Sequence, residues 1–363
     1  MLGAVVPSPS MVGEPAAPTS ASVVARVESL SATGLEPEVS VVVSTYGRCG
    51  FLADLVEALE AQDLPRAAFE VVVVDNGSGD ETWSLLEARA AQTPLRFVAV
   101  RLEANCGAGG GRNAGLLQAR APIVAFTDDD CIPAPNWLSA LHATRTLGDP
   151  DKVVVQGKTV PWPDDAAGAG PWDRTVWVLR PTWLFETCNI SYGRAALMEA
   201  GGFPSEGHAP SGAKGRAFGE DALAGWAVVG SGAELYFADD AVVYHRHLAA
   251  TYRQWLEEQR GKGGFPALVA TDPRVRTALW SRYFLAPRTA MFDVAVLGLV
   301  AACVSGRARW LTLGAVWAAM ALGEARERGG GPLPLRLAQL AAGDAVGAWS
   351  LASSSARHRR LVL

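Results

Sequence analysis

The stretch Ile123-Val124-Ala125-Phe126-Thr127-Asp128-Asp129-Asp130 decides the fold, because an apolar run ends directly at three consecutive carboxylates. The apolar part predicts a buried strand, and like charges gathered at its end repel one another and are costly to bury. Mg²⁺ or Mn²⁺ relieves that cost and is commonly shared with substrate phosphates. Ligands of open α/β sheets bind at the carboxyl ends of the strands, which favours a cation site here. A solvated acidic turn is the plain alternative.

Outward from this stretch, strand-like and helix-like segments alternate four times. Runs rich in Val and Ile predict buried strands at residues 39–43, 70–74, 95–102 and 123–126. Helical spacing of apolar residues marks 51–62, a helix is also predicted over 80–91, and another ends at Arg120. This alternation predicts an α/β fold with a mostly parallel sheet and helices on both faces.

A glycine-rich loop is predicted at residues 107–111, before Arg112. It follows the third strand and lacks the full GxGxxG spacing, so we reject a dinucleotide-binding fingerprint. Glycines still let backbone N–H groups approach a ligand, and Arg112 can pair with an anion.

Several short motifs follow one another along the chain. They are Val41–Tyr46, Val74–Ser78, Arg112–Gly115, the Asp triplet, Asn189–Tyr192, Gly201–Phe203, Gly219–Asp221 and Val243–His245. This order resembles the family 2 glycosyltransferases of the GT-A fold over roughly residues 38–262. The resemblance implies a nucleotide-diphospho-sugar transferase sheet and inverting transfer.

The resemblance also implies roles for individual residues. Asp221, paired with Glu220, would be the catalytic base, and Asp130 and His245 would bind Mn²⁺ or Mg²⁺. The nucleotide sugar would be held by residues from several loops: Thr45, Tyr46, Arg48, Asp75, Asn105, Arg112, Asp128, Asp129, Arg260 and Lys262.

The chemistry of sugar transfer needs these residue types even without the resemblance. A cation must stabilise the departing diphosphate, and a carboxylate must take the proton of the acceptor hydroxyl. Plainer interpretations stay open: Asp75 as a turn residue, His245 as a polar strand end, and Glu220-Asp221 as a helix N-terminus. Trp226 is a core residue or a sugar platform, and we favour the core.

Charge is distributed unevenly along the 363 residues. The chain through His245 holds 30 acidic and 16 basic residues, whereas the remainder holds 7 and 16. An acidic body with a basic tail does not fit a nucleic-acid binder, but the tail fits an anionic membrane surface. The five scattered cysteines and the lack of a signal-peptide pattern predict a cytoplasmic protein.

Two segments of the chain, one before the proposed catalytic region and one inside it, are rich in Pro, Ser and Gly. Residues 1–37, rich in Pro, Ala and Ser, are predicted to be a disordered extension. Residues 205–218 predict a lid that carries Lys214 and Arg216.

Residues 263–363 are predicted to be helical and membrane-associated. Apolar stretches at 289–306 and 310–323 flank Arg307 and Arg309. Because both are marginal in length for spanning, we expect a hairpin in the cytoplasmic leaflet. A soluble helical subdomain is the alternative.

The sequence therefore predicts a metal-dependent inverting glycosyltransferase at the cytoplasmic face of a membrane. It would use a nucleotide diphosphate sugar and an acceptor hydroxyl, with a lipid-linked glycan or polysaccharide as candidate acceptors. The alternatives are a nucleotidyltransferase built on the same sheet and a GT-A scaffold without activity.

Overall fold

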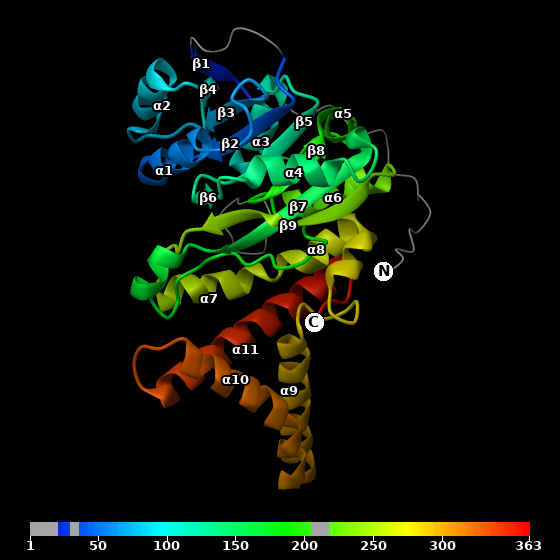
Figure 1. Cartoon of the computed structure of the whole chain (residues 1–363). Coiled ribbons are helices and arrows are strands. Elements are labelled where there is room, and N and C mark those ends of the chain that lie inside the picture. The colour runs from blue at the N-terminus through cyan, green and yellow to red at the C-terminus, as the bar shows by residue number, and fades with distance from the viewer. Residues whose placement is uncertain (1–20, 30–35, 205–217) are drawn as a thin grey trace.

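A mixed sheet forms the centre of the molecule (Figure 1). The structure, a computed structural model, describes residues 21–29, 36–204 and 218–363. Within them the sheet has nine strands in the order β1-β4-β3-β2-β5-β8-β7-β9-β6. The strands are β1 Val23–Glu28, β2 Val39–Thr45, β3 Phe69–Asp75, β4 Arg96–Leu102, β5 Ile123–Phe126, β6 Cys131–Pro133, β7 Val153–Pro161, β8 Ile190–Gly193 and β9 Glu234–His245.

The predicted α/β fold is confirmed, and the direction of the strands divides the sheet into two parts. β2 pairs in parallel with β3 and β5, and β3 pairs in parallel with β4. Beyond β5 the strands run both ways: β8 is antiparallel to β5 and β7, whereas β7 and β9 are parallel. The alternating strand and helix signals thus describe the first part, and the second part makes the sheet mixed.

Helices cover both faces of the sheet and form the C-terminal region. They are α1 Cys49–Glu60, α2 Thr82–Gln92, α3 Gly107–Gln118, α4 Trp137–Arg145, α5 Arg194–Glu199, α6 Glu220–Gly230, α7 Tyr252–Gly261, α8 Gly264–Thr271, α9 Pro287–Ser305, α10 Ala315–Glu327 and α11 Leu333–His358. Short 3₁₀ turns lie at Pro150–Lys152, Pro163–Gly168, Pro273–Ala278 and Ala308–Gly314.

The prediction of a disordered extension over residues 1–37 is wrong at Val23–Glu28. These residues form β1, which pairs antiparallel with β4 and closes that edge of the sheet. Ser29 extends the contact, because its hydroxyl donates to the carbonyl oxygen of Leu95 at 2.7 Å. Pairing with a buried neighbour strand orders a segment whose composition alone resembles a linker.

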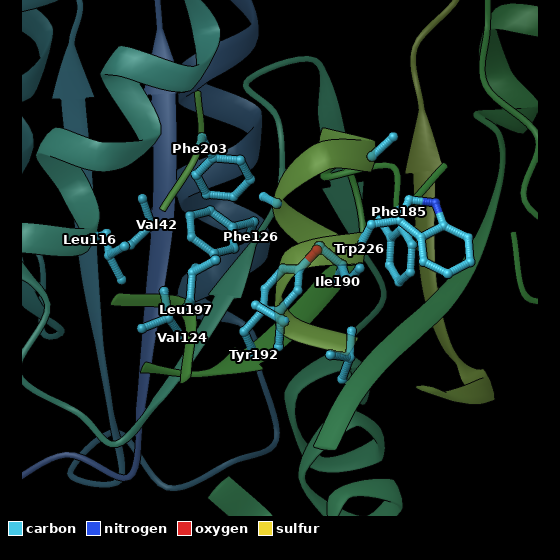
Figure 2. Packing of buried hydrophobic residues seen from close by; sticks show 14 of the residues in the cluster. Val42, Leu116, Val124, Phe126, Phe185, Ile190, Tyr192, Leu197, Phe203 and Trp226 are labelled. Carbon is cyan, nitrogen blue, oxygen red and sulfur yellow. The ribbon is translucent and has the colours of Figure 1, made fainter. Parts of the chain in front are cut away.

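Alternate residues of each strand face opposite layers of helices. In β2, Val41 and Val43 pack with side chains of α1, α2 and α4. Val42 packs on the other face with side chains of α3, α6 and α8. Figure 2 shows this second cluster, in which Phe126 lies between Phe203 and Tyr192.

The glycine run that we predicted as a loop lies inside α3, which begins at Gly107. A Cβ atom at Gly111 would overlap the side chain of Ser44, and one at Gly115 would overlap Val42. The glycines therefore let α3 lie directly against β2, and Arg112 is carried to the strand ends by this close contact.

Two helices of the C-terminal region, α8 and α11, pack into the buried cluster on one face of the sheet. Leu268 and Val269 of α8 belong to the same buried cluster as Val42, and Leu351 of α11 joins it. The boundary that we predicted after residue 262 falls between α7 and α8, inside this continuous packing.

Helix α9 extends away from the body of the molecule (Figure 1). Among the described helices it is the one whose length and apolar composition would let it cross a bilayer, and 11% of its apolar window is buried. Leu297 and Val300 are 66% and 53% exposed. Length and composition alone are weak evidence for a span.

We expect Gly115→Ala to lower the free energy of unfolding by about 1–3 kcal/mol, the usual cost of overpacking a core. The added methyl group would overlap Val42, which is fully buried. Gly50→Ala in α1 is the matched control, because its Cβ would meet no atom within 4 Å. Urea denaturation of both variants measures the difference. If Gly115→Ala proves as stable as Gly50→Ala, α3 does not lie this close to the sheet.

Candidate functional site

The register of the parallel strands brings the predicted polar residues to one edge of the sheet. Thr45 at the end of β2 lies beside Asp75 at the end of β3. Val42 lies beside Phe126, the last residue of β5, so the Asp triplet follows at the same edge. Asp75 and the three carboxylates of the triplet thus lie at the same edge of the sheet, because their strands end there.

Arg48 neutralises the second and third carboxylates of the triplet. One of its guanidinium nitrogens lies 2.9 Å from Asp129 Oδ1 and 2.6 Å from Asp130 Oδ2. The Thr45 hydroxyl donates to Asp129 Oδ2 at 2.7 Å. Burial raises the pKa of Asp129 to about 6, although Arg48 acts in the opposite direction. Charges this deep need a cation beside them, and in this structure Arg48 supplies it.

The two predicted metal ligands face each other. Cys131 of β6 pairs with His245 of β9, which places His245 Nε2 3.5 Å from Asp130 Oδ1. Nδ1 of His245 lies 2.8 Å from the carbonyl oxygen of Arg246, which only accepts, so a neutral imidazole carries its proton on Nδ1. The lone pair of Nε2 then faces a carboxylate oxygen, an arrangement that a cation between them stabilises.

This donor set fits Mn²⁺, which accepts both imidazole and carboxylate ligands. Mg²⁺ fits the carboxylate better than the imidazole. The Cys131 thiol completes a group whose ligand atoms all lie within 4.8 Å of one another. Burial raises the pKa of Cys131 well above its usual value, so it is present as a neutral thiol and a poor ligand for these hard ions.

Arg112 of α3 joins the triplet to the proposed base. One nitrogen lies 2.9 Å from Asp128 Oδ1. The other lies 2.9 Å from Asp221 Oδ1 and 3.2 Å from Glu220 Oε1. Its side chain is 10% exposed, so each of these pairs is largely removed from water. One arginine therefore holds three carboxylates that come from two distant parts of the chain.

Asp221 lies in the first turn of α6 and has the environment of a general base. Burial raises its pKa to about 7, against the opposing effect of Arg112 and with a further rise from Glu220. The backbone N–H and the hydroxyl of Thr187 both donate to Asp221 Oδ2, at 3.2 and 2.9 Å. A carboxylate with a pKa near neutral is suited to accept a proton.

Thr187 was missed by the sequence reasoning. It is buried in a turn before β8, outside every motif that the sequence analysis identified, and its contact with Asp221 spans 34 positions of the chain. The signal that could have found it is its place two residues before Asn189, the start of a motif.

Asp75 is fully buried, and one of its two carboxylate oxygens accepts a hydrogen bond. Its Oδ1 accepts from the backbone N–H of Ser78 at 2.8 Å. Its Oδ2 lies 3.4 Å from Arg101 Nε but has no hydrogen-bond partner among the described residues. Buried polar atoms are nearly always paired, so this oxygen is an acceptor available to a donor from a ligand. Tyr46 beside it is 53% exposed.

Some predicted residues have structural contacts in this arrangement. Asn105 accepts from the backbone N–H of Gly107 at 2.8 Å, which shapes the turn into α3. Asn189 is satisfied by three internal partners, among them the indole N–H of Trp137 at 2.8 Å. Trp226 is buried and stacks on Trp183, which agrees with a place in the core.

Two predicted diphosphate contacts lie outside this cluster of charges. Arg260 lies near Leu256 and Glu257 on α7, and Lys262 packs against Gly347 of α11. Their contact with a diphosphate stays a prediction. The lid residues Lys214 and Arg216 lie outside the part of the chain that the structure describes.

Comparisons with known proteins agree with the geometry of the sheet and its site. Residues 40–194 match the family model described as glycosyl transferase family 2. Among solved structures, the chain is similar to the mannosyltransferase PcManGT from Pyrobaculum calidifontis in complex with GDP-Man and Mn2+. The TM-score is 0.61 and the identity 25%, over 87% of this chain and 88% of that one.

Curated relatives match over shorter regions. Glycosyltransferase AglE from Haloferax volcanii is 35% identical over 29% of this chain and 34% of its own length. The poly(ribitol-phosphate) beta-N-acetylglucosaminyltransferase TarS from Staphylococcus aureus is 39% identical over 25% of this chain and 16% of its own. The chain thus spans 34% and 16% of the length of these two relatives. It carries a family 2 glycosyltransferase domain with the GT-A fold.

Proposed function

We propose that the chain transfers a sugar from a nucleotide diphosphate sugar to an acceptor hydroxyl, with inversion at the sugar and with Mn²⁺ or Mg²⁺. One observation carries the proposal. Arg112 pairs with the proposed base, Asp221, and with Asp128, the first residue of the Asp triplet. The last residue of the triplet, Asp130, is one candidate metal ligand and faces the other, His245. A base and a leaving-group site therefore lie on the two sides of one buried arginine.

The donor would bind along the carboxyl ends of β2, β3 and β5. The Oδ2 of Asp75, which has no hydrogen-bond partner among the described residues, suits an N–H of the nucleotide base, and Tyr46, which follows Thr45, offers an exposed ring. Asp128 and Asp129 would lie near the ribose. PcManGT, a relative in fold, is described in complex with GDP-Man and Mn2+, which supports a nucleotide sugar and a cation together.

The metal would be held by Asp130 and His245. Bound there, a divalent cation supplies positive charge to the diphosphate as it departs. Arg48, which now pairs with Asp129 and Asp130, would turn toward phosphate oxygens when the cation takes over these carboxylates. Its side chain is 40% exposed and so has room to turn.

Asp221 would take the proton of the acceptor hydroxyl while that oxygen attacks the anomeric carbon. The bond from this carbon to the phosphate oxygen breaks, and the nucleotide diphosphate leaves with the electron pair. Attack opposite the leaving group inverts the anomeric centre. Arg112 would exchange its contact with Asp221 for a phosphate oxygen, which frees Asp221 Oδ1 to accept the proton.

The acceptor would be a lipid-linked glycan or a polysaccharide at the cytoplasmic face of a membrane. Exposed apolar side chains on α9 and the excess of basic residues after His245 support a position on an anionic bilayer. The relative TarS is named for a poly(ribitol-phosphate) acceptor.

We expect Asp221→Asn to reduce sugar transfer by about 10²–10⁴-fold, the usual contribution of a positioned base. Nucleotide diphosphate binding should change little. The assay incubates the protein with radiolabelled UDP-, GDP- and dTDP-sugars, Mn²⁺ and lipid extract. Asp63→Asn, an exposed carboxylate that accepts from Ser139, is the matched control. Full transfer by Asp221→Asn would contradict the assignment.

Release of pyrophosphate from a nucleoside triphosphate would instead favour the nucleotidyltransferase alternative, and no turnover would favour the inactive scaffold.

We expect the acidic limb of the rate–pH profile to lie near pH 7, because Asp221 must be ionised to act and burial raises its pKa to about 7. Thr187→Val removes a hydrogen bond to the ionised form, which raises that pKa further. The limb should therefore move about 0.5–1 unit to higher pH, with kcat above pH 8.5 nearly retained. Thr146→Val, whose hydroxyl donates to the carbonyl oxygen of Ala143 at the protein surface, should leave the profile unchanged. A loss of rate that is equal at every pH would show that Thr187 does not act through Asp221.

A further inference from the structure

A cavity of about 330 Å³ lies between α9 and α11, apart from the charged cluster of the proposed active site. Its walls are mainly apolar and include Phe292 and Val296 of α9 and Ala348, Trp349 and Leu351 of α11. The volume is at the lower end for small-molecule sites, so it fits one chain or ring and not a large ligand.

Lys262 lies at the wall of this cavity, directly after α7. Gly347 makes room for it, since a Cβ at that position would lie 3.2 Å from Lys262 Cδ and 3.6 Å from Nζ. The Lys262 ammonium has no hydrogen-bond or ion-pair partner among the described residues. Burial lowers its pKa, and Asp344 acts in the opposite direction. The Lys262 side chain is half-buried, and an ammonium without an ion-pair partner beside an apolar cavity favours an anionic ligand.

The nearest acidic group is already engaged. Asp344 lies 2.8 Å from a guanidinium nitrogen of Arg288 and accepts from the indole N–H of Trp317 at 2.9 Å. Arg288 also pairs with Glu324, and Glu324 with Arg328. With Asp293, which also lines the cavity, the charged groups around it are three basic and three acidic residues, and Lys262 is the one of the three basic residues that no described acidic group pairs with.

The apolar wall continues onto exposed apolar side chains of α9. Val296 lines the cavity, and the residues that follow it on α9, Leu297, Leu299 and Val300, are 66%, 54% and 53% exposed. This helix projects from the body in Figure 1 and is long and apolar enough to cross a bilayer. A lipid chain can therefore pass from a membrane to the cavity along one continuous apolar surface.

We propose that the cavity holds one acyl chain of an anionic membrane lipid, with the phosphate of its head group paired to Lys262. The proposal rests on the membrane association proposed above and is independent of the sugar chemistry. It gives Lys262 a ligand other than the donor diphosphate and gives the C-terminal helices a specific lipid contact in addition to a general apolar one.

The site can be tested in solution with monododecyl phosphate, kept below its critical micelle concentration, by isothermal titration calorimetry on the full chain. We expect saturable binding of one molecule. Lys262→Met should weaken it about tenfold, the effect of losing one charge-assisted hydrogen bond. Ala348→Phe, which fills the cavity, should abolish it. Arg253→Met is the matched control, because Arg253 is a basic residue of α7 whose side chain is 88% exposed.

Four outcomes would overturn the proposal. One is the absence of saturable binding by the unmodified protein. Another is equal binding by all variants, which would show adsorption to the exposed face of α9. The third is equal, Lys262-dependent binding of inorganic phosphate, which would show a free-anion site without a chain. Titration with UDP and GDP in the presence of Mn²⁺ separates the two roles of Lys262: if Lys262→Met weakens nucleotide binding and leaves dodecyl phosphate binding unchanged, the residue serves the donor and the lipid site is refuted.

Discussion

The structure depends on the burial of like charges that two arginines hold together. Arg48 pairs with Asp129 and Asp130, and Arg112 pairs with Asp128, Glu220 and Asp221. A buried carboxylate without a cation is strongly destabilising, so the protein either keeps these arginines in place or exchanges them for other positive charge. In the proposed reaction, a cation at Asp130 would replace Arg48 beside the carboxylates, and the donor diphosphate would receive the released guanidinium groups.

The sheet makes this arrangement possible by ending its strands at a common edge. β2, β3 and β5 are in parallel register, so side chains that are 30 to 84 positions apart in the chain meet without any long-range signal in the sequence. Close packing of α3 on β2 then sets the position of Arg112. Asn113 reinforces it, because its side-chain amide donates to the carbonyl oxygen of Phe203 at 2.7 Å and accepts from the N–H of Phe203 at 2.8 Å. The chemistry of the site thus follows from how closely one glycine-rich helix approaches one strand.

The sequence was sufficient for the features that depend on local pattern. Runs of valine predicted β2 and β3, and the Asp triplet after β5 predicted a polar edge at which Asp130 and His245 meet. Features that depend on contacts between distant segments were not predictable. β1 is a strand only because β4 offers it a free edge, and the glycine run is helical only because the sheet requires close approach. The hydrogen bond from the Thr187 hydroxyl to Asp221 is another such feature, because it joins residues 34 positions apart in the chain.

The most direct measurement is isothermal titration calorimetry of UDP, GDP and dTDP with and without Mn²⁺, on the unmodified protein and on Asp130→Asn. If the Asp triplet and His245 form a cation site shared with a diphosphate, one nucleotide should bind in the presence of Mn²⁺ at least tenfold more tightly than in its absence, a difference of about 1.4 kcal/mol. Asp130→Asn should remove this metal dependence. Nucleotide binding that is indifferent to Mn²⁺, or a metal effect that survives Asp130→Asn, would contradict the account and leave the triplet as an acidic cluster held only by its arginines.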